Sequence, residues 1–179
     1  AVRFETLLNL ARLLAGPALE AGGGGHQRVS DPVVAAAVRS VLASSADLLR
    51  PVAGHPATER ALVRVHRELR ELDAAELDAL AATGPRATEV VRLHREVHGR
   101  LDGRYVDEVD LYRAATATVA AGHPLLDDLG ALVLHLPERL PASGLALVEA
   151  LANRVPLAVV AARTGDESAD DALRDLVGR

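Results

Sequence analysis

Cysteine is absent from this sequence of 179 residues. A disulfide framework, a thiolate metal site and a cysteine nucleophile are therefore excluded, and a reducing compartment suits the chain. Long apolar runs are missing too: no stretch approaches the roughly 20 residues of a membrane-spanning helix. The opening AVRFETLLNLARLLAG is an amphipathic pattern and not a signal peptide. We therefore expect a cytoplasmic protein without membrane contact.

Lysine is also missing, so that all 20 cationic side chains are arginines. We interpret this first as the coding bias of a GC-rich genome, and second as selection for the bidentate phosphate contacts that arginine makes. The formal net charge of −5 argues against a domain that coats nucleic acid indiscriminately. Any contact with DNA must come from a local basic patch.

Aromatic residues are limited to Phe4, Tyr105 and Tyr112. The core must be built from Leu, Val and Ala, which favours packed helices over a β-sandwich. Methionine is absent, and the chain opens directly into an apolar pattern without a helix cap. These two features indicate a segment of a larger protein, with the length of one domain or two small lobes.

Apolar residues at helical spacing dominate the first two thirds of the chain. Ser30-Asp31-Pro32 is a typical helix start, Asp73 and Glu76 form a capping box, and Gly16-Pro17 is expected to stop the first helix. The glycine-rich residues 21–26 lack the Lys and the Ser or Thr of a P-loop, so we expect a flexible linker. The expected helices are 4–15, 30–45, 56–71, 73–82, 85–99 and 107–121.

The sequence changes in character after residue 123. Two short apolar runs, residues 131–135 and 156–161, flank an expected helix over 141–153, and a polar tail helix follows. This order predicts a βαβ unit with parallel strands. Two parallel strands cannot cover both of their faces, so the unit requires a larger sheet. The expected fold is mainly α, with a helical lobe over 1–123 and a partial α/β lobe over 124–179.

His94 and His98 are four residues apart on one expected helix and could hold a metal, as in HExxH enzymes. Here Glu96 follows His94 by two residues instead of one, and no third ligand is defined. We therefore interpret both histidines as part of an ordinary solvated or half-buried helix face. A small metal-dependent enzyme would rest on these two residues alone.

Clustered carboxylates are the remaining candidates for chemistry. Asp107, Glu108 and Asp110 lie at an expected helix start, where negative charge interacts favourably with the helix dipole. Asp127 and Asp128 could bind a cation but are more typical of a solvated turn. No nucleophile motif such as GxSxG occurs. We expect no catalytic residue, no metal ligand and no cofactor in this chain.

Six segments follow one another along nearly the whole chain: VRFETLLNLARLLAG, RVSDPVVAAAVRSVLA, HPATERALVRVHRELRELD, RATEVVRLHREVHGRL, YVDEVDLYRAAT and LGALVLHLPERL. In order and spacing they resemble the inactive helicase-like part of AddB-type subunits of bacterial helicase-nucleases. Actinobacterial relatives of that kind are PD-(D/E)XK nuclease family proteins. The resemblance implies a P-loop helicase-like domain, distantly similar to UvrD-type helicases.

The resemblance also assigns roles to two stretches. Residues 105–111 would match an acidic-aromatic segment of UvrD-type helicases, and residues 131–139 the Walker B strand. An active motor ends that strand in Asp-Glu, which organises Mg²⁺ and the attacking water. This chain has His135 and Leu136, which offer a hard cation no oxygen. The position is a degenerate Walker B, and the family's C-terminal nuclease motif is not present in these residues.

The resemblance therefore implies that this chain serves as a scaffold and as a path for DNA. The implied partners are DNA, in single-stranded form, a helicase-nuclease partner subunit and the remainder of the same polypeptide. The competing hypothesis is a helical protein–protein interaction or regulatory module without a nucleic-acid role. The acidic net charge suits this alternative better.

Arginines recur at spacings of three and four on two expected helices, so that each set lies along one helix face. Arg70 is expected to face outward with those of the first set. Intrahelical pairing with Glu68, Glu71 and Glu96 could neutralise both sets. The expected DNA contacts are Arg60, Arg64 and Arg67 on one helix and Arg92 and Arg95 on the other.

Overall fold

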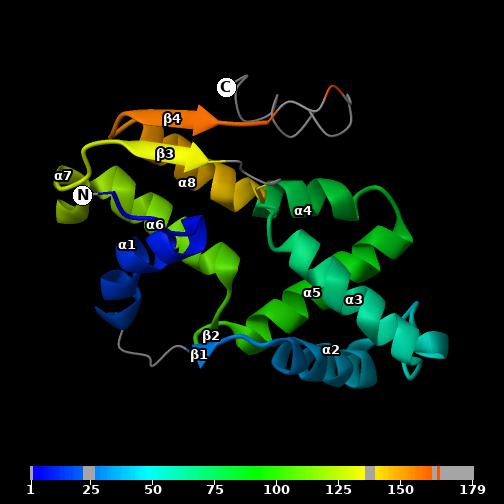
Figure 1. Cartoon of the computed structure of the whole chain (residues 1–179). Coiled ribbons are helices and arrows are strands. Elements are labelled where there is room, and N and C mark those ends of the chain that lie inside the picture. Colours follow the sequence, from blue (N-terminus) through cyan, green and yellow to red (C-terminus); the bar gives the residue numbers. More distant parts are fainter. Residues whose placement is uncertain (1, 22–26, 136–139, 163–164, 166–179) are drawn as a thin grey trace. The chain divides into compact units, whose positions relative to one another are not determined.

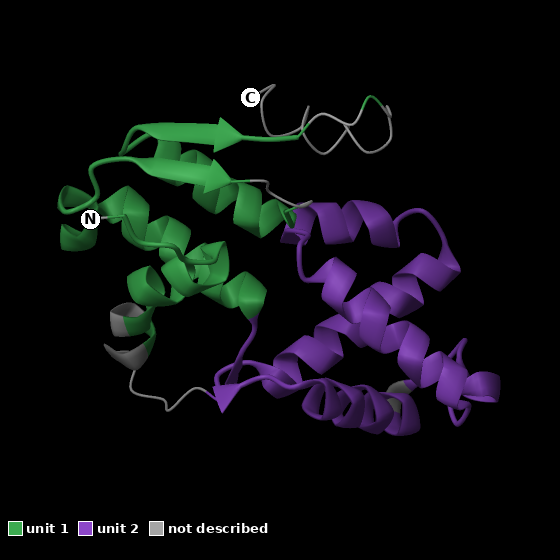
Figure 2. Cartoon of the chain, in the orientation of Figure 1, with its two compact units in different colours: residues 1–23, 108–179 green, residues 24–107 purple. Residues whose placement is uncertain are grey.

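The computed structural model describes residues 2–21, 27–135, 140–162 and 165. The chain forms two compact units, shown in Figure 2: unit 1 comprises residues 1–23 and 108–179, and unit 2 comprises residues 24–107. Unit 2 is therefore an insertion in the sequence of unit 1. This division differs from the boundary expected at residue 123, because the first helix packs on residues that follow 107. The extent of independently folding domains stays a prediction.

Unit 1 contains the helices α1 (Leu7–Ala21), α6 (Glu108–Ala121), α7 (Pro124–Asp127) and α8 (Ala142–Ala152). Helix α6 packs against both α1 and α8 (Figure 1). The apolar faces of these helices form the core of the unit. Its fully buried residues include Leu14, Ala15, Ala115, Val119, Leu147 and Leu151.

Helix α1 continues through Gly16-Pro17 to Ala21, so the expected stop at residue 15 is wrong. A proline inside a helix removes one backbone hydrogen bond and destabilises the helix by about 3 kcal/mol. Burial of Ala11, Leu14 and Ala15 in the core offsets this cost. Tertiary packing here overrides a local stop signal.

The strands β3 (Leu132–His135) and β4 (Leu157–Val160) pair in parallel, with Leu132 opposite Leu157 and His135 opposite Val160. They lie side by side and are connected by α8 (Figure 1), so the expected order of strand, helix and parallel strand is confirmed. Neither strand has a buried residue, and Val133 and Val160 are 62% and 47% exposed. A pair of parallel strands occurs in many α/β folds and does not identify a P-loop helicase-like domain.

Unit 2 contains α2 (Asp31–Ser45), the short 3₁₀ helix η1 (Arg50–Val52), α3 (Pro56–Leu69), α4 (Ala74–Ala81) and α5 (Pro85–Leu101). Helix α5 packs against each of the other three α-helices. One cluster of apolar side chains joins α2 to α5, and a second joins α3 and α4 to α5. Their buried members are Val34, Val38, Val41, Leu42, Ala46, Leu93 and Val97 in the first, and Leu69, Leu77 and Val91 in the second.

The expected caps are confirmed in part. Asp73 accepts a hydrogen bond from the Glu76 backbone N–H, and Glu76 accepts one from the Asp73 backbone N–H, both at 2.8 Å. This reciprocal pair is the predicted capping box. Ser30 occupies the N-cap position of α2, but its side chain forms no cap hydrogen bond.

A second parallel pair was not expected from the sequence. The strands β1 (Gln27–Arg28) and β2 (Tyr105–Val106) pair at the two ends of unit 2. Strands of two residues carry no detectable periodicity. Residues 22–26 of the glycine-rich loop, Leu136 and the expected polar tail helix lie outside the described residues.

The prediction of a mainly α fold is confirmed, since helices make up most of the described chain. None of the described helices combines the length and the apolar character needed to cross a membrane.

Candidate nucleic-acid interface

The arginines of α3 lie on its exposed face, as predicted. Arg67 forms an ion pair with Asp31 at the start of α2. Arg64 is 78% exposed and meets Glu68 only at 3.8 Å, between Nε and Oε1. Arg60 has no ion-pair partner among the described residues. Exposed pairs of this kind contribute about 0–1 kcal/mol, so Arg60 and Arg64 are available to a ligand at little cost.

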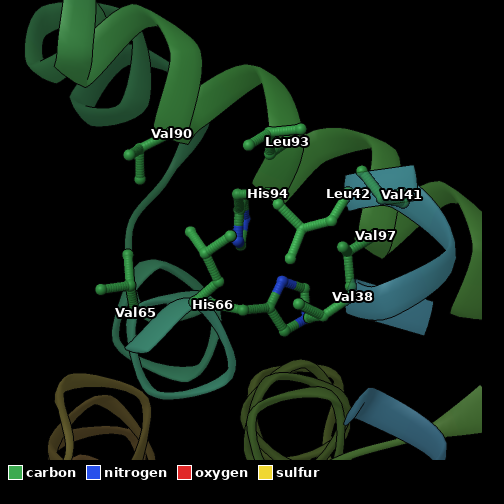
Figure 3. Close-up of a pocket in the computed structure, with 10 residues that line it drawn as sticks. Val38, Val41, Leu42, Val65, His66, Val90, Leu93, His94 and Val97 are labelled. Carbon is green, nitrogen blue, oxygen red and sulfur yellow. The ribbon is translucent and has the colours of Figure 1, made fainter. Parts of the chain in front are cut away.

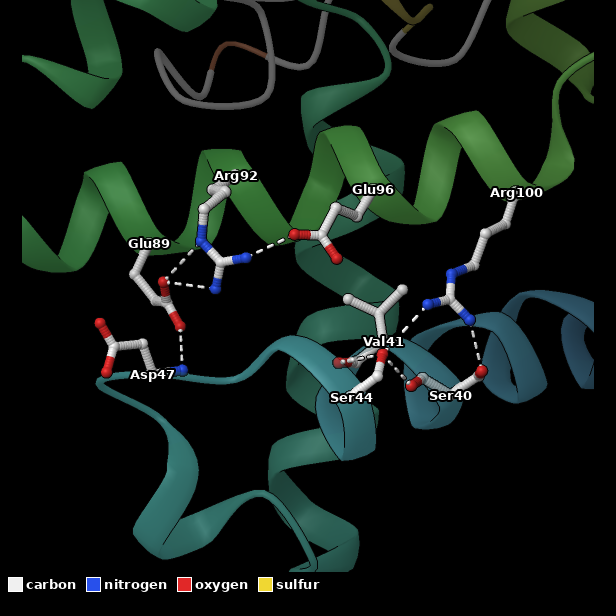
Figure 4. Close-up of polar contacts among 8 residues, drawn as sticks. All are labelled: Ser40, Val41, Ser44, Asp47, Glu89, Arg92, Glu96 and Arg100. Atoms are coloured by element: carbon white, nitrogen blue, oxygen red, sulfur yellow. Dashed lines mark hydrogen bonds and ion pairs between the residues drawn. The ribbon is translucent and has the colours of Figure 1, made fainter.

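On α5, the two arginines expected to contact DNA lie closer to carboxylates than Arg60 and Arg64 of α3 do. Arg92 lies between two carboxylates of its own helix, Glu89 and Glu96 (Figure 4). Arg95 donates to Asp78 on α4 at 2.6 Å. The expected neutralisation by intrahelical pairing is thus found for Arg92 with Glu96 and, at longer range, for Arg64 with Glu68.

Glu89 is buried and connects α5 to the end of α2. Its Oε1 accepts a hydrogen bond of 2.7 Å from the Asp47 backbone N–H, and its Oε2 accepts two from Arg92. Burial raises the pKa of the Glu89 carboxyl, but the bonds from Asp47 and Arg92 outweigh it, so that the pKa is lowered. Arg92 therefore holds a structural carboxylate, which makes it the least accessible of the expected DNA contacts.

Arg70 does not face outward as expected, because it is buried. Its guanidinium donates to both carboxylate oxygens of Asp107, at 2.7 Å from Nε and 3.3 Å from the terminal nitrogen. This two-bond ion pair compensates the positive charge of Arg70, whose burial would otherwise cost free energy. Asp107 was expected to interact with the helix dipole of α6. It directly follows β2, and its ion pair with Arg70 ties that point of the chain to the end of α3.

His94 is also buried, and the expectation of a solvated or half-buried face is wrong for this residue. Its ring lies against that of His66 on α3, with centroids 4.7 Å apart, in a hollow lined by apolar side chains of α2, α3 and α5 (Figure 3). The ring of the half-buried His98 is nearly parallel to that of His94, with centroids 6.5 Å apart. Sequence analysis missed His66 as a partner, because only the packing of α3 on α5 brings the two rings together.

The Nδ1 atoms of His66 and His94 have no hydrogen-bond partner among the described residues. Burial, and after it neighbouring groups that carry positive charge, lower the pKa of His66 to about 3 and that of His94 to about 4. Both rings are therefore neutral at pH 7. The described part of the chain holds no cluster of three or more His, Asp or Glu side chains suited to a metal ion.

Unit 1 carries the expected degenerate Walker B position at the end of β3. His135 is the last residue of that strand and is exposed, while Leu136 lies outside the described residues. Asp127 closes the short helix α7 and Asp128 is its C-cap, both exposed. Strand β3 thus ends in an exposed imidazole.

Comparison of the chain with protein-family models, with curated proteins and with solved structures finds no match. The resemblance to AddB-type subunits therefore rests on the sequence pattern alone and stays a prediction. Function has to be argued from the contacts described above.

Proposed function

We propose that this chain is a non-catalytic, helicase-like segment of a bacterial DNA-repair and recombination nuclease of the AddB type, in which it serves as scaffold and DNA path. Its partners would be single-stranded DNA, a helicase-nuclease partner subunit and the remainder of its own polypeptide. A cytoplasmic location belongs to the same proposal.

The half-covered sheet of unit 1 carries the proposal. Parallel strands are normally buried on both faces, yet β3 and β4 leave Val133 and Val160 largely exposed. A sheet of two such strands is completed by further strands, which supports a segment of a larger α/β protein. The order of the six sequence segments supports an AddB-type parent and a P-loop helicase-like domain.

The residue at the end of β3 supports the proposed absence of motor chemistry. His135 has no oxygen with which to hold Mg²⁺, and an imidazole does not replace the carboxylates that position Mg²⁺ and water in ATP hydrolysis. A segment of this kind can orient other parts of an enzyme or guide DNA. It does not supply the energy for movement.

The paired arginines favour a second candidate, a helical interaction or regulatory module without a nucleic-acid role. Arg67, Arg92 and Arg95 each contact a carboxylate, and the net charge of the chain is −5. A surface neutralised in this way attracts phosphate weakly. Only the loosely held Arg60 and Arg64 favour DNA on α3.

Binding of a single-stranded oligonucleotide to the full chain, measured by filter retention over a range of salt concentrations, separates the two candidates. Phosphate contacts release counterions, so a DNA path gives a log affinity that falls linearly with log salt. Arg64→Ala should reduce that slope by about 0.7 without changing base preference. Arg95→Ala should do the same if release from Asp78 lets Arg95 reach phosphate.

Absence of salt-dependent binding by the wild-type chain would exclude the DNA path and leave the interaction module. Circular dichroism of each variant is the control for folding. An unchanged slope in both variants, with the fold intact, would remove these two arginines from any binding surface.

A further inference from the structure

Arg100, in the last turn of α5, contacts hydroxyl groups instead of carboxylates. Its two terminal nitrogens donate to the Oγ atoms of Ser40 and of Ser44, the latter at 3.1 Å (Figure 4). These two serines are one turn apart on α2. Among the described residues they are the partners of this guanidinium. Arg92, two turns earlier, lies instead between Glu89 and Glu96.

The donors of this cluster are only partly used. A guanidinium has five N–H groups, and hydroxyl oxygens accept from two of those on Arg100. The Ser40 hydroxyl accepts from Arg100 and donates to no described residue. The Ser44 hydroxyl donates to the Ser40 backbone carbonyl at 2.9 Å, which orients its oxygen as an acceptor. The cluster therefore keeps a positive charge, several N–H donors and one O–H donor for a ligand.

The backbone on both sides of the cluster is held by the core of unit 2. Val38 and Val41 on α2 pack with Leu93 and Val97 on α5, and all four are buried. The nearest upstream acid on α5, Glu96, is occupied by Arg92. Arg100 is thus positioned by packing, and no carboxylate of the described residues forms an ion pair with it, in contrast to Arg67, Arg92 and Arg95.

We propose that Arg100 and Ser40, supported by Ser44, bind a backbone phosphate of single-stranded nucleic acid. A phosphate group accepts from the guanidinium fork and from a hydroxyl, and both kinds of donor are present here. No part of the cluster reads a base, so binding is independent of sequence. This inference rests on the proposed role as a DNA path, and it adds a contact that sequence analysis did not include.

The test measures the affinity of the full chain for a single-stranded oligonucleotide against salt, in four variants. Arg100→Ala should lower affinity about tenfold at low salt and reduce the slope by about 0.7. Arg100→Lys should keep the slope and lose affinity, because the charge remains without the planar fork. Ser40→Ala should weaken binding several-fold with the wild-type slope, because no charge is removed. Arg86→Ala, at the other end of α5, is the matched control and should change neither.

Equal changes in slope for Arg100→Ala and Arg86→Ala would indicate a general charge effect and overturn the inference. A wild-type slope in Arg100→Ala would also overturn it, while salt-dependent wild-type binding would leave the proposed DNA path standing. No wild-type binding would overturn both. Titration with inorganic phosphate, followed by the NMR signal of the Ser40 amide, tests the other source of phosphate. Saturation by free phosphate, with no effect of Arg100→Ala on DNA, would also overturn the inference.

Discussion

His66 and His94 lie ring against ring in the core of unit 2, and neither Nδ1 atom has a polar partner among the described residues. Protonation of either ring is opposed by the positive charges of Arg70 and His98, and that of His94 also by Arg95. At His66, the carboxylate of Asp107 favours protonation. From α2, only the apolar Val38, Val41 and Leu42 line the hollow. A proton on either imidazole would therefore be buried, and neither Asp107 at His66 nor the His66 backbone at His94 offsets the cost of burial.

We predict that unit 2 loses stability between pH 7 and pH 5. The folded-state pKa values of about 3 and about 4 lie below the ordinary 6.5, so the unfolded chain binds more protons. The stabilisation is complete above pH 6.5 and is lost as the pH falls toward the folded values. At pH 5 the loss is roughly 2 kcal/mol for each histidine. Urea denaturation at both pH values measures it.

His66→Leu is the matched variant for this pH dependence. It removes one titrating ring and keeps an apolar side chain in the hollow, so the stability difference between pH 7 and pH 5 should fall by about half. The lowered carboxyl pKa values of the chain belong to a more acidic range and do not contribute at pH 5. Equal urea midpoints for the wild type at both pH values would contradict the prediction.

Glu89 and Glu96 both contact Arg92 but differ in burial, so they form a natural comparison. We predict that Glu89→Gln destabilises unit 2 by about 1–3 kcal/mol, because the buried bonds to Arg92 and the Asp47 N–H are weakened. Glu96→Gln should change stability by less than about 1 kcal/mol, since its carboxylate is one third exposed. Denaturant titrations at pH 7 test both. An equal effect of the two substitutions would contradict a structural role for Glu89.

At the scale of elements, the helices of the two units are more deeply buried than the β3–β4 pair. Each long helix described above contributes buried residues to a core, whereas β3 and β4 contribute none. Two parallel strands with one open face gain little from burial and leave their outer edges without strand partners in the described chain. Their hydrogen bonds are therefore expected to open more readily than those of the helices.

We predict that the amides of Leu132 to Leu134 and of Ala158 to Val160 exchange with solvent faster than the central amides of α6. The reason is the shallow burial of the strands, whose side chains are all partly or fully exposed. Hydrogen exchange followed by mass spectrometry or NMR measures the difference. Protection of both strands equal to that of α6 would mean that the sheet needs no further strands.

At the scale of the whole chain, unit 1 is built from the two ends of the sequence and unit 2 from the middle. Helices α1 and α6 pack against each other, and the whole of unit 2 lies between them in the sequence. The contacts that complete unit 1 are thus long-range in sequence, and their loop-closure entropy grows only slowly with the length of the insertion.

We predict that the chain neither hydrolyses ATP nor is stabilised by Mg-ATP. A ligand at one hundred times its dissociation constant would add about 2.7 kcal/mol, which is visible as a shift in melting temperature. In the proposed helicase-like segment, His135 at the end of β3 would replace the acids of a motor, so no shift is expected. Thermal melting with and without Mg-ATP, together with a phosphate-release assay, is the measurement. Turnover accompanied by a shift would contradict the degenerate Walker B assignment.

Elements whose signals are local could be predicted from the amino-acid sequence. Pro32, Pro56 and Pro85 each lie in the first turn of a helix, and Asp73 with Glu76 closes a capping box, because these effects act within one turn. The two short apolar runs on either side of α8 likewise indicated two parallel strands. Exposed Arg64 and the pairing of Arg92 with Glu96 also follow from spacing along a single helix.

Contacts between residues of different segments could not be predicted from the sequence and became visible in the folded chain. Three contacts join segments distant in sequence: His94 with His66, Arg70 with Asp107, and Arg100 with Ser40. Helix α1 runs past Gly16-Pro17 because its buried face offsets a local penalty. Periodicity shows which face of a helix is apolar. It does not show which other helix covers that face, because packing depends on the shape and register of both surfaces.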